Sequence, residues 1–486
     1  MANTELSRRR FLKKSSQLSL ATAAAVNSMG MLGLLGASQS LADSTDHKAL
    51  VFIMLTGGND SYNMLVPTGD NQLRRNYENH RGVVALPEAD LHSLQLASPA
   101  AVYTGNDSPP TSSTEFAMHP ACPAMAELFN SGELAVICNT GNLIEPTSKV
   151  QFDNGGVALP PQLFSHSDQQ RQLQSEPSNP FRYGWGGRMA ELLSDYNLDN
   201  NVSPLIAVGG LNSFQVTQDG LINSYSLGNS GAPSLYGYYG ASQQILEASM
   251  QSIDAQAHLM AQKYRSTFDS AIKAQSIVQG AFAQAESLGV DYDGIFAAAG
   301  AVATNNSTKR LITVAKMIAG RSLTNNQRPV YFVEIPGFDN HQNLLSDHHD
   351  LMAELNAALK GFHDVLVAQG DFDQVLTLVG SEFARTFTPN GEDSEAGTDH
   401  GWGGHSMVMG GMINGGQLFG THPDLALDQG LDTGRGRWIP TTTNSQCSAV
   451  VAHWMGIPQN QINQLFPSLE NFASPFDATS NLDFIT

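Results

Sequence analysis

Five apolar runs along the chain have the pattern of buried β-strands. Each run is rich in β-branched or aromatic residues and ends near a polar, glycine-containing turn, as expected for strands that are covered on both faces of a parallel sheet. The runs are ALVFIML (49–55), ELAVICNTG (133–141), SPLIAVGG (203–210), RPVYFVEIPGFDNH (328–341) and FDQVLTLVGSEF (372–383).

Between these runs, apolar residues recur with the period of an amphipathic helix. This pattern covers residues 123–129, 188–193 and 344–367. Strands that alternate with helices predict an α/β fold with a doubly wound, mostly parallel sheet flanked by helices.

Residues 235–321 interrupt this alternation, because they contain long amphipathic helical stretches and no strand pattern. We interpret them as a helical insertion or cap over the sheet. The alternative is that they are long crossover helices of the same domain. In either case residues 43–486 are expected to form one α/β domain.

The N-terminus has the pattern of an export signal. A basic segment, SRRRFLKK, precedes a moderately apolar stretch (18–35) and the small residues Ser40-Leu41-Ala42, which suit signal cleavage before Asp43. The adjacent arginines resemble the twin-arginine signal. Residues 1–42 are therefore expected to be a signal peptide, with the twin-arginine export machinery as a partner and a periplasmic or secreted location. An ordinary secretory signal or an uncleaved anchor is the alternative. We expect no stable membrane span after cleavage, since no further span is found.

The charge of the chain argues against a nucleic-acid partner. The whole sequence has 25 basic and 45 acidic residues, a formal charge of −20. Residues 1–42 hold five basic residues and one acid, which leaves 20 basic and 44 acidic residues and a charge of −24. Binding to duplex nucleic acid depends on basic contacts to phosphates. Bound metal cations remain compatible with this charge.

The cysteines do not predict a metal site, because the sequence contains no C-x-x-C spacing. Cys122 lies in a predicted helix and Cys138 in a predicted strand. An export compartment would permit a disulfide between them, and two separately buried thiols are the alternative.

Acids, imidazoles and one arginine follow three of the predicted strands. In open α/β sheets, ligands bind outside the carboxyl ends of the strands, so we expect these side chains to converge at one edge. They are Asp60 after the first run, Asp339 and His341 after the fourth, and Glu382, Arg385, Asp399, His400 and His405 after the fifth.

Asp and His together are ligands for divalent metals such as Zn, Mn, Mg or Ca. One or two such ions per chain are expected as cofactors. Two ions a few ångströms apart could bind the attacking and leaving oxygens of a displacement at phosphorus. The glycines around residues 397–411 would let the backbone approach an ion closely.

Several motifs resemble the secreted bacterial family known as domain of unknown function 1501. The motifs occur in that family's order and span residues 51–420. The family is similar to the alkaline phosphatase and sulfatase superfamily, so the resemblance implies an alkaline phosphatase-like fold with metals at strand ends. The motifs are LTGGNDSYNMLVP, HPACPAMAELFNSGELAVICNTGN, YGWGGRMAELL, IPGFDNHQNL and VGSEFARTFTPNGEDSEAGTDHGWGGHSMVMGGMINGG.

The resemblance implies roles for particular residues. Asp60 resembles the first-strand aspartate that binds one metal, and Asp399 and His400 resemble a later Asp-His pair on the same ion. Asp339 and His341 resemble ligands of a second ion.

His405 is a candidate third ligand of that second ion. In the superfamily, three residues commonly separate the acid and the histidine, whereas one residue separates Asp339 from His341. His348 and His349 therefore remain as alternatives.

By the same resemblance, the motif LFSHSDQQ gives Ser165 as the candidate nucleophile, with His166 and Ser167 close to it. Metal contact would activate such a serine by lowering its pKa. Arg385 would bind a substrate oxyanion with two parallel hydrogen bonds, or it could instead form a salt bridge to Glu382 or another acid.

These observations favour an exported, metal-dependent hydrolase that acts on phosphate or sulfate esters of small molecules or glycans. The alternative is a non-catalytic exported binding protein that keeps the fold and possibly one metal. A redox protein is a weaker third hypothesis, since the sequence has no cofactor fingerprint.

Overall fold

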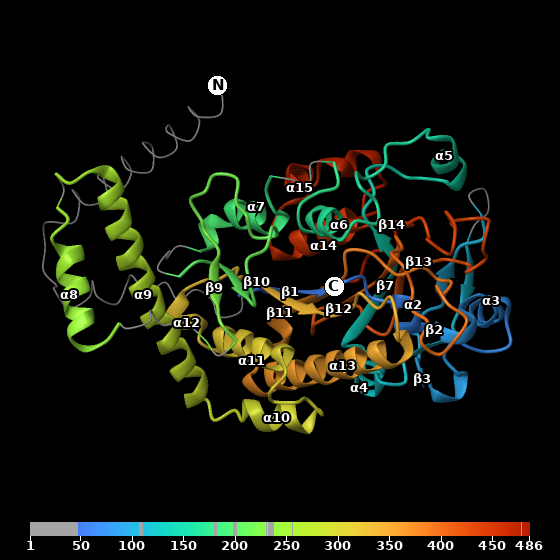
Figure 1. Cartoon of the computed structure of the whole chain (residues 1–486), viewed down its shortest axis with the longest axis horizontal. Coiled ribbons are helices and arrows are strands. Elements are labelled where there is room, and N and C mark those ends of the chain that lie inside the picture. The colour runs from blue at the N-terminus through green and yellow to red at the C-terminus, as the bar shows by residue number, and fades with distance from the viewer. Residues whose placement is uncertain are drawn as a thin grey trace, which may run out of the picture. The chain divides into compact units, whose positions relative to one another are not determined.

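A mostly parallel β-sheet runs through the part of the chain that the computed structural model describes (Figure 1). The described residues are 47–105, 110–178, 182–197, 202–229, 231, 238–254, 256–477 and 479–486. The expected signal peptide lies outside them. Residues Lys48–Thr486 form one compact unit.

The main sheet has eleven strands in the order β5-β4-β13-β7-β12-β11-β1-β10-β8-β9, with β14 paired to β7. A second, three-stranded sheet has the order β2-β6-β3. The strands of the main sheet are β1 (Ala49–Thr56), β4 (Ala100–Val102), β5 (Thr111–Ser113), β7 (Leu134–Gly141), β8 (Leu205–Val208), β9 (Tyr225–Leu227), β10 (Val330–Pro336), β11 (Val375–Gly380), β12 (Gly404–Met409), β13 (Leu418–His422) and β14 (Thr442–Thr443). Those of the second are β2 (Leu65–Pro67), β3 (His92–Ser93) and β6 (Phe116–Met118).

The direction of β12 positions the functional residues. Strand β1 pairs in parallel with β10 and β11, whereas β12 runs antiparallel to both β11 and β7. The start of β12 therefore lies at the edge where β1, β10 and β11 end. The segment between β11 and β12 leaves the sheet and returns to it at this one edge.

Helices cover both faces of the main sheet. Figure 1 shows α14 and α15 on one side and α11 and α13 on the other. Residues 240–319 are mainly helical, as the sequence predicts. The helices are α2 (Ser61–Met64), α3 (Gln72–Arg81), α4 (Pro123–Asn130), α5 (Lys149–Asn154), α6 (His166–Gln174), α7 (Trp185–Leu192), α8 (Gly240–Gln251), α9 (Leu259–Ser287), α10 (Tyr292–Ala298), α11 (Asn306–Ala319), α12 (Arg321–Thr324), α13 (Leu344–Gln369), α14 (Asn444–Met455) and α15 (Gln459–Leu465).

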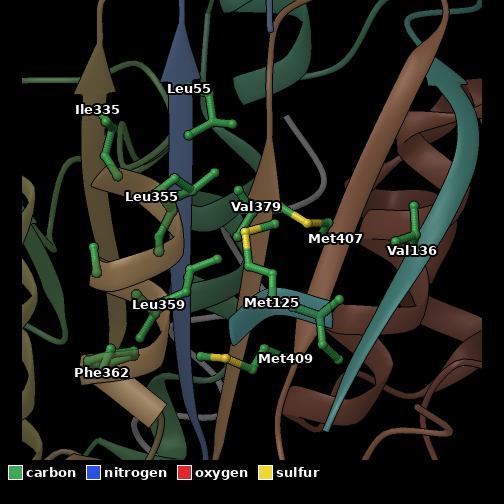
Figure 2. Close-up of a cluster of buried hydrophobic side chains, with 14 of the residues drawn as sticks. Leu55, Met125, Val136, Ile335, Leu355, Leu359, Phe362, Val379, Met407 and Met409 are labelled. Carbon is green, nitrogen blue, oxygen red and sulfur yellow. The ribbon is translucent and has the colours of Figure 1, made fainter. Parts of the chain in front are cut away.

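Alternate residues of β1 enter two different cores, because successive side chains of a strand point to opposite faces. Val51 and Ile53 belong to the cluster that contains α13 residues, whereas Leu50 and Phe52 belong to the cluster that contains α14 residues. Figure 2 shows the first core, where Leu355, Leu359 and Phe362 of α13 lie near side chains of several strands and Met125 of α4. Burial on both faces explains why the strand runs are continuously apolar.

The predicted α/β fold class is confirmed. All five apolar runs contain strands of the main sheet, and the three predicted helices correspond to α4, α7 and α13. Cys122, Cys138 and Cys447 are free and buried, so Cys122 and Cys138 follow the alternative of two separately buried thiols. Among the described helices, none combines the length and apolar character needed to cross a bilayer.

Candidate metal centre

The loops that follow β1 and β10 touch through a glycine. Gly57, directly after β1, has a φ of +121°. A Cβ atom on Gly57 would lie 2.3 Å from the backbone nitrogen of Asp339, which follows β10. Only glycine combines this backbone conformation with so close an approach. The loops after β1 and β10 are therefore in direct contact at the site.

The segment between β11 and β12 folds back on itself and carries Asp399 and His400 to the same place. The backbone nitrogen of Thr386 donates to the carbonyl of Asp399 at 2.8 Å, and Ala384 donates to Trp402 at 3.0 Å. A Cβ atom on Gly397 would lie 2.1 Å from the carbonyl carbon of His341.

Three side chains form a group that could hold a metal ion: His166, Asp339 and His400, whose ligand atoms all lie within 4.8 Å of one another. The Oδ1 atom of Asp339 lies 3.3 Å from Nε2 of His166 and 3.4 Å from Nε2 of His400. Ligand atoms bound at about 2.0–2.1 Å around one tetrahedral ion lie about 3.3 Å apart. These separations fit three ligands of one ion.

Each histidine at this site is oriented by an oxygen at its Nδ1 atom. Nδ1 lies 2.9 Å from Oε1 of Glu382 in His166, 2.7 Å from the carbonyl of Phe164 in His400, and 3.1 Å from Oδ1 of Asp399 in His341. Carbonyls and carboxylates only accept, so each ring donates its Nδ1 proton and the neutral imidazole keeps a lone pair at Nε2. An oxygen that accepts the Nδ1 proton in this way fixes the tautomer of metal-binding histidines.

The Nε2 atoms point toward a common region. Nε2 of His166 is buried and has no hydrogen-bond partner among the described residues. Nε2 of His341 lies 3.1 Å from Oδ1 of Asp339 and 3.0 Å from Nε2 of His400. Lone pairs facing each other at this distance repel unless a proton or another cation lies between them. The donor set of two or three imidazoles and a carboxylate suits Zn or another transition metal better than Mg or Ca.

Charges around the cluster shift its pKa values in different directions. The hydrogen bond to Glu382 raises the pKa of His166, while burial lowers that of His400. Burial alone would raise the pKa of Asp339, but the hydrogen bond and charge of Arg385 outweigh it and lower the pKa. Asp339 is therefore held as a carboxylate, the form that binds a cation.

Arg385 is completely buried and its donors are used within the protein. Its Nη1 atom donates to Oδ1 of Asp339 at 2.6 Å and to the carbonyl of Gly57 at 3.1 Å, and Nη2 donates to the carbonyl of Thr398. Of the two roles expected for Arg385, these contacts match the salt bridge, with Asp339 as the acid. Arg385 links the loops after β1, β10 and β11.

The structure does not bring Asp60 to the cluster. Its carboxylate is fully buried and pairs with the equally buried guanidinium of Arg81, at the end of α3. Arg81 also donates to the carbonyl of Phe387 at 2.9 Å. The family resemblance implies that Asp60 binds a metal, but the positive charge beside its carboxylate is the guanidinium of Arg81. We therefore leave Asp60 out of the proposed centre.

His405 also lies apart from the cluster. Its Nδ1 atom accepts from the backbone nitrogen of Asn139 at 3.1 Å, and its ring stacks on His422 with centroids 5.1 Å apart. Burial holds the pKa of His405 well below its usual value. Because its contacts lie outside the cluster, we leave His405 out of the centre.

The remaining candidates have other contacts. The hydroxyl of Ser165 donates to Oδ2 of Asp168 at 2.6 Å. His348 is buried, with Nε2 3.0 Å from Oδ1 of Asn59, and its ring lies 5.4 Å from that of His119. His349 lies against His119, with ring centroids 5.5 Å apart. None of these contacts joins the described cluster.

Two members of the site had no metal-binding role in the sequence analysis. The sequence gives His166 only as a neighbour of the candidate nucleophile, and it gives Glu382 as one of the acids at the strand ends and as a possible partner of Arg385. His166 begins α6, which does not follow a predicted strand, so the strand-end rule could not find it. Its place in the LFSHSDQQ motif was the one signal available.

The family model described as "Protein of unknown function (DUF1501)" matches residues 47–433. No curated protein matches the sequence.

Solved structures that are similar to the chain include the following three. The lipoteichoic acid synthase LtaP from Listeria monocytogenes has 8% sequence identity and a TM-score of 0.31, over 78% of this chain and 70% of LtaP. Ps i-CgsB in complex with k-i-k-neocarrahexaose has 9% identity and a TM-score of 0.31, over 88% and 77%. A mutant of the alkaline phosphatase PafA has 9% identity and a TM-score of 0.24, over 70% and 63%.

Proposed function

The chain belongs to the DUF1501 family of proteins of unknown function, and we propose that it is an exported, metal-dependent hydrolase of phosphate or sulfate esters. One observation carries this proposal. His166 and His400 each donate the Nδ1 proton to an oxygen and direct Nε2 toward Oδ1 of Asp339, at 3.3 and 3.4 Å. This arrangement provides a neutral nitrogen pair and an anionic oxygen for one cation.

In this proposal His166, Asp339 and His400 hold the ion, and a bound divalent ion would polarise an ester oxygen as a Lewis acid. Arg385 keeps Asp339 ionised and in place. His341 is 42% exposed at its side chain and is oriented by Asp399, so it can accept or donate a proton at Nε2 next to the reacting ester.

The nucleophile in this proposal is either the hydroxyl of Ser165 or a water molecule. Ser165 directly precedes His166, and its hydroxyl donates to Asp168. A carboxylate that accepts this proton would raise the nucleophilicity of the serine oxygen. In this step Asp168 would take the hydroxyl proton along the existing hydrogen bond as the serine oxygen attacks.

The same observation favours a second candidate, a non-catalytic exported protein that binds one metal. If Asp168 holds the Ser165 hydroxyl permanently, the site has a cation but no positioned nucleophile. The two candidates differ in turnover and agree in metal content.

The test uses the full-length chain, purified without chelators, with metal content measured by mass spectrometry and turnover measured on 4-nitrophenyl phosphate and 4-nitrophenyl sulfate. We expect about one transition-metal ion per chain, its loss in Asp339→Asn, and turnover that falls with it. Absence of bound metal in the wild-type protein would refute both candidates. Metal without turnover on either ester, and with no effect of Ser165→Ala, would favour the binding protein.

We further propose that the twin-arginine machinery exports this protein to the periplasm or the medium. The support is the basic sequence SRRRFLKK ahead of a moderately apolar stretch. Replacing Arg8 and Arg9 by lysine should leave the protein in the cytoplasm, as cell fractionation would show. Unchanged export of that variant would indicate an ordinary secretory signal.

A further inference from the structure

A cavity of about 210 Å³ adjoins the metal cluster on the side of β1 and β10. Two of its lining residues connect it to the cluster. Ser167 directly follows His166, and Gln170 donates from Nε2 to Oε1 of Glu382 at 3.0 Å, the same oxygen that orients His166. The alcohol part of an ester bound at the cluster would have to extend past Ser167 and Gln170 to reach this space.

The lining is mainly uncharged and polar, over an apolar floor. Thr56 donates from Oγ1 to Oε1 of Glu334 at 3.0 Å, which places a hydroxyl and a carboxylate side by side. The side chain of Asn212 is fixed by Gln215, whose backbone nitrogen donates to its Oδ1 at 2.9 Å. Phe332, on β10, supplies a buried aromatic surface beneath these groups.

These groups match the chemistry of a sugar ring. Neighbouring hydroxyls of a sugar can donate to a carboxylate such as Glu334, and can both donate to and accept from amides such as Asn212 and Gln170. The apolar C–H groups of the ring would contact the small part of Phe332 that lines the cavity. The volume is smaller than the roughly 300–1,000 Å³ typical of pockets for drug-sized ligands, so it suits one ring.

We propose that this cavity selects the alcohol part of the substrate, and that the substrate is a phosphate or sulfate ester of a single sugar unit. This inference rests on the hydrolase function proposed above. In this proposal, Glu334 and Asn212 determine the specificity for the alcohol part of the substrate. Arg171 lines the same cavity and adds a positive charge there.

The experiment compares two substrates of the full-length protein as purified with its metal: glucose 6-phosphate and 4-nitrophenyl phosphate, with the corresponding two sulfates in parallel. The variants are Glu334→Gln and Asn212→Ala. The matched control is Glu115→Gln, a carboxylate in a separate polar cavity of about 680 Å³ around α3 and β5. Binding of the sugar esters is measured separately by saturation-transfer NMR on the sugar ring protons.

For phosphate esters, sulfate esters or both, we expect wild-type protein to have a higher kcat/KM on the sugar ester than on the 4-nitrophenyl ester. Glu334→Gln and Asn212→Ala should lower that preference about tenfold or more, mainly through KM, because each variant removes a hydrogen-bond partner of the sugar hydroxyls. Glu115→Gln should keep the wild-type ratio.

Two other outcomes separate this inference from the hydrolase function. Turnover of esters with a substrate ratio that neither variant changes would refute the sugar subsite and leave the hydrolase standing. If no ester is turned over, the hydrolase fails, and the NMR decides the subsite: ring-proton saturation that is lost in Glu334→Gln supports it, and no saturation in wild-type protein refutes it.

Discussion

The Nδ1 atom of His166 lies 2.9 Å from Oε1 of Glu382, a carboxylate that is 1% exposed. The same oxygen accepts from the backbone nitrogen of Gly57 at 2.9 Å. One buried carboxylate therefore fixes the start of α6 to the loop after β1 and sets the direction in which Nε2 of His166 points. It is a positioning residue for the proposed metal ligand.

This relationship predicts that Glu382→Gln weakens metal binding about 10- to 100-fold, the range found for partners of metal-binding histidines. The amide retains the shape and one oxygen of the carboxylate but loses its charge. Isothermal titration calorimetry of metal-free protein with Zn²⁺ measures the change in Kd. Glu392→Gln, an exposed carboxylate in the segment between β11 and β12, is the control and should bind as wild type does. Equal Kd values for wild type and Glu382→Gln would refute the positioning role.

The buried pair of Asp60 and Arg81 predicts a loss of stability without a loss of metal. Both side chains are fully buried, and Asp60→Asn leaves the guanidinium without its counter-charge. Removing one partner of a buried ion pair typically costs about 3–5 kcal/mol. Urea unfolding should show this decrease in the free energy of unfolding, while metal content stays at the wild-type level. A stable variant that has lost its metal would instead support the role implied by the family resemblance, in which Asp60 is a ligand.

The stacked pair of His405 and His422 predicts a loss of stability in acid. Burial lowers the pKa of His422 from its usual value of 6.5 to about 4. Between these two pH values the unfolded chain binds a proton that the folded chain does not, so the contribution of His422 is fully present above about pH 6.5 and is lost as the pH falls toward 4. The loss is on the order of 3 kcal/mol.

His422→Asn removes this titration and can keep the hydrogen bond that Nδ1 makes with the carbonyl of Pro423. We expect the variant to lose less stability than wild type between pH 7 and pH 4 in urea unfolding. The exposed His258→Asn is the control and should follow the wild-type pH dependence. A wild-type pH dependence in His422→Asn would contradict the prediction.

The sequence predicts the sheet well because its strands are covered on both faces. A continuous apolar run such as residues 49–55 is too short for a buried helix and suits a strand that is covered on both faces. The same reasoning explains why Asp339, His341, Asp399 and His400 lie together: the first pair follows β10, and the second precedes β12, whose antiparallel direction returns the chain to the same edge. Their roles as ligands remain a prediction.

Pairings across long sequence distances could not be predicted in this way. His166 reaches Glu382 across 216 positions, and Asp60 pairs with Arg81 at the end of a helix, where a cation is normally solvated. The residue type alone does not tell whether a carboxylate after a strand binds a metal ion or pairs with an arginine. Only the packing of α3 against the loop after β1 decides between them for Asp60.

The contact between Gly57 and Asp339 gives a test of the close approach of the two loops. A Cβ at Gly57 would lie 2.3 Å from the backbone nitrogen of Asp339 and 2.7 Å from the carbonyl carbon of Phe338. Gly57→Ala must therefore displace the loop that carries Asp339, and we expect weaker metal binding as well as lower stability. Gly105→Ala is the matched control, since Gly105 has a similar φ of +127° and nothing within 4 Å of its Cβ position. It should show only the backbone strain of about 1–2 kcal/mol, with unchanged metal content. If both variants lose the same stability and both keep their metal, the contact between these loops does not position the site.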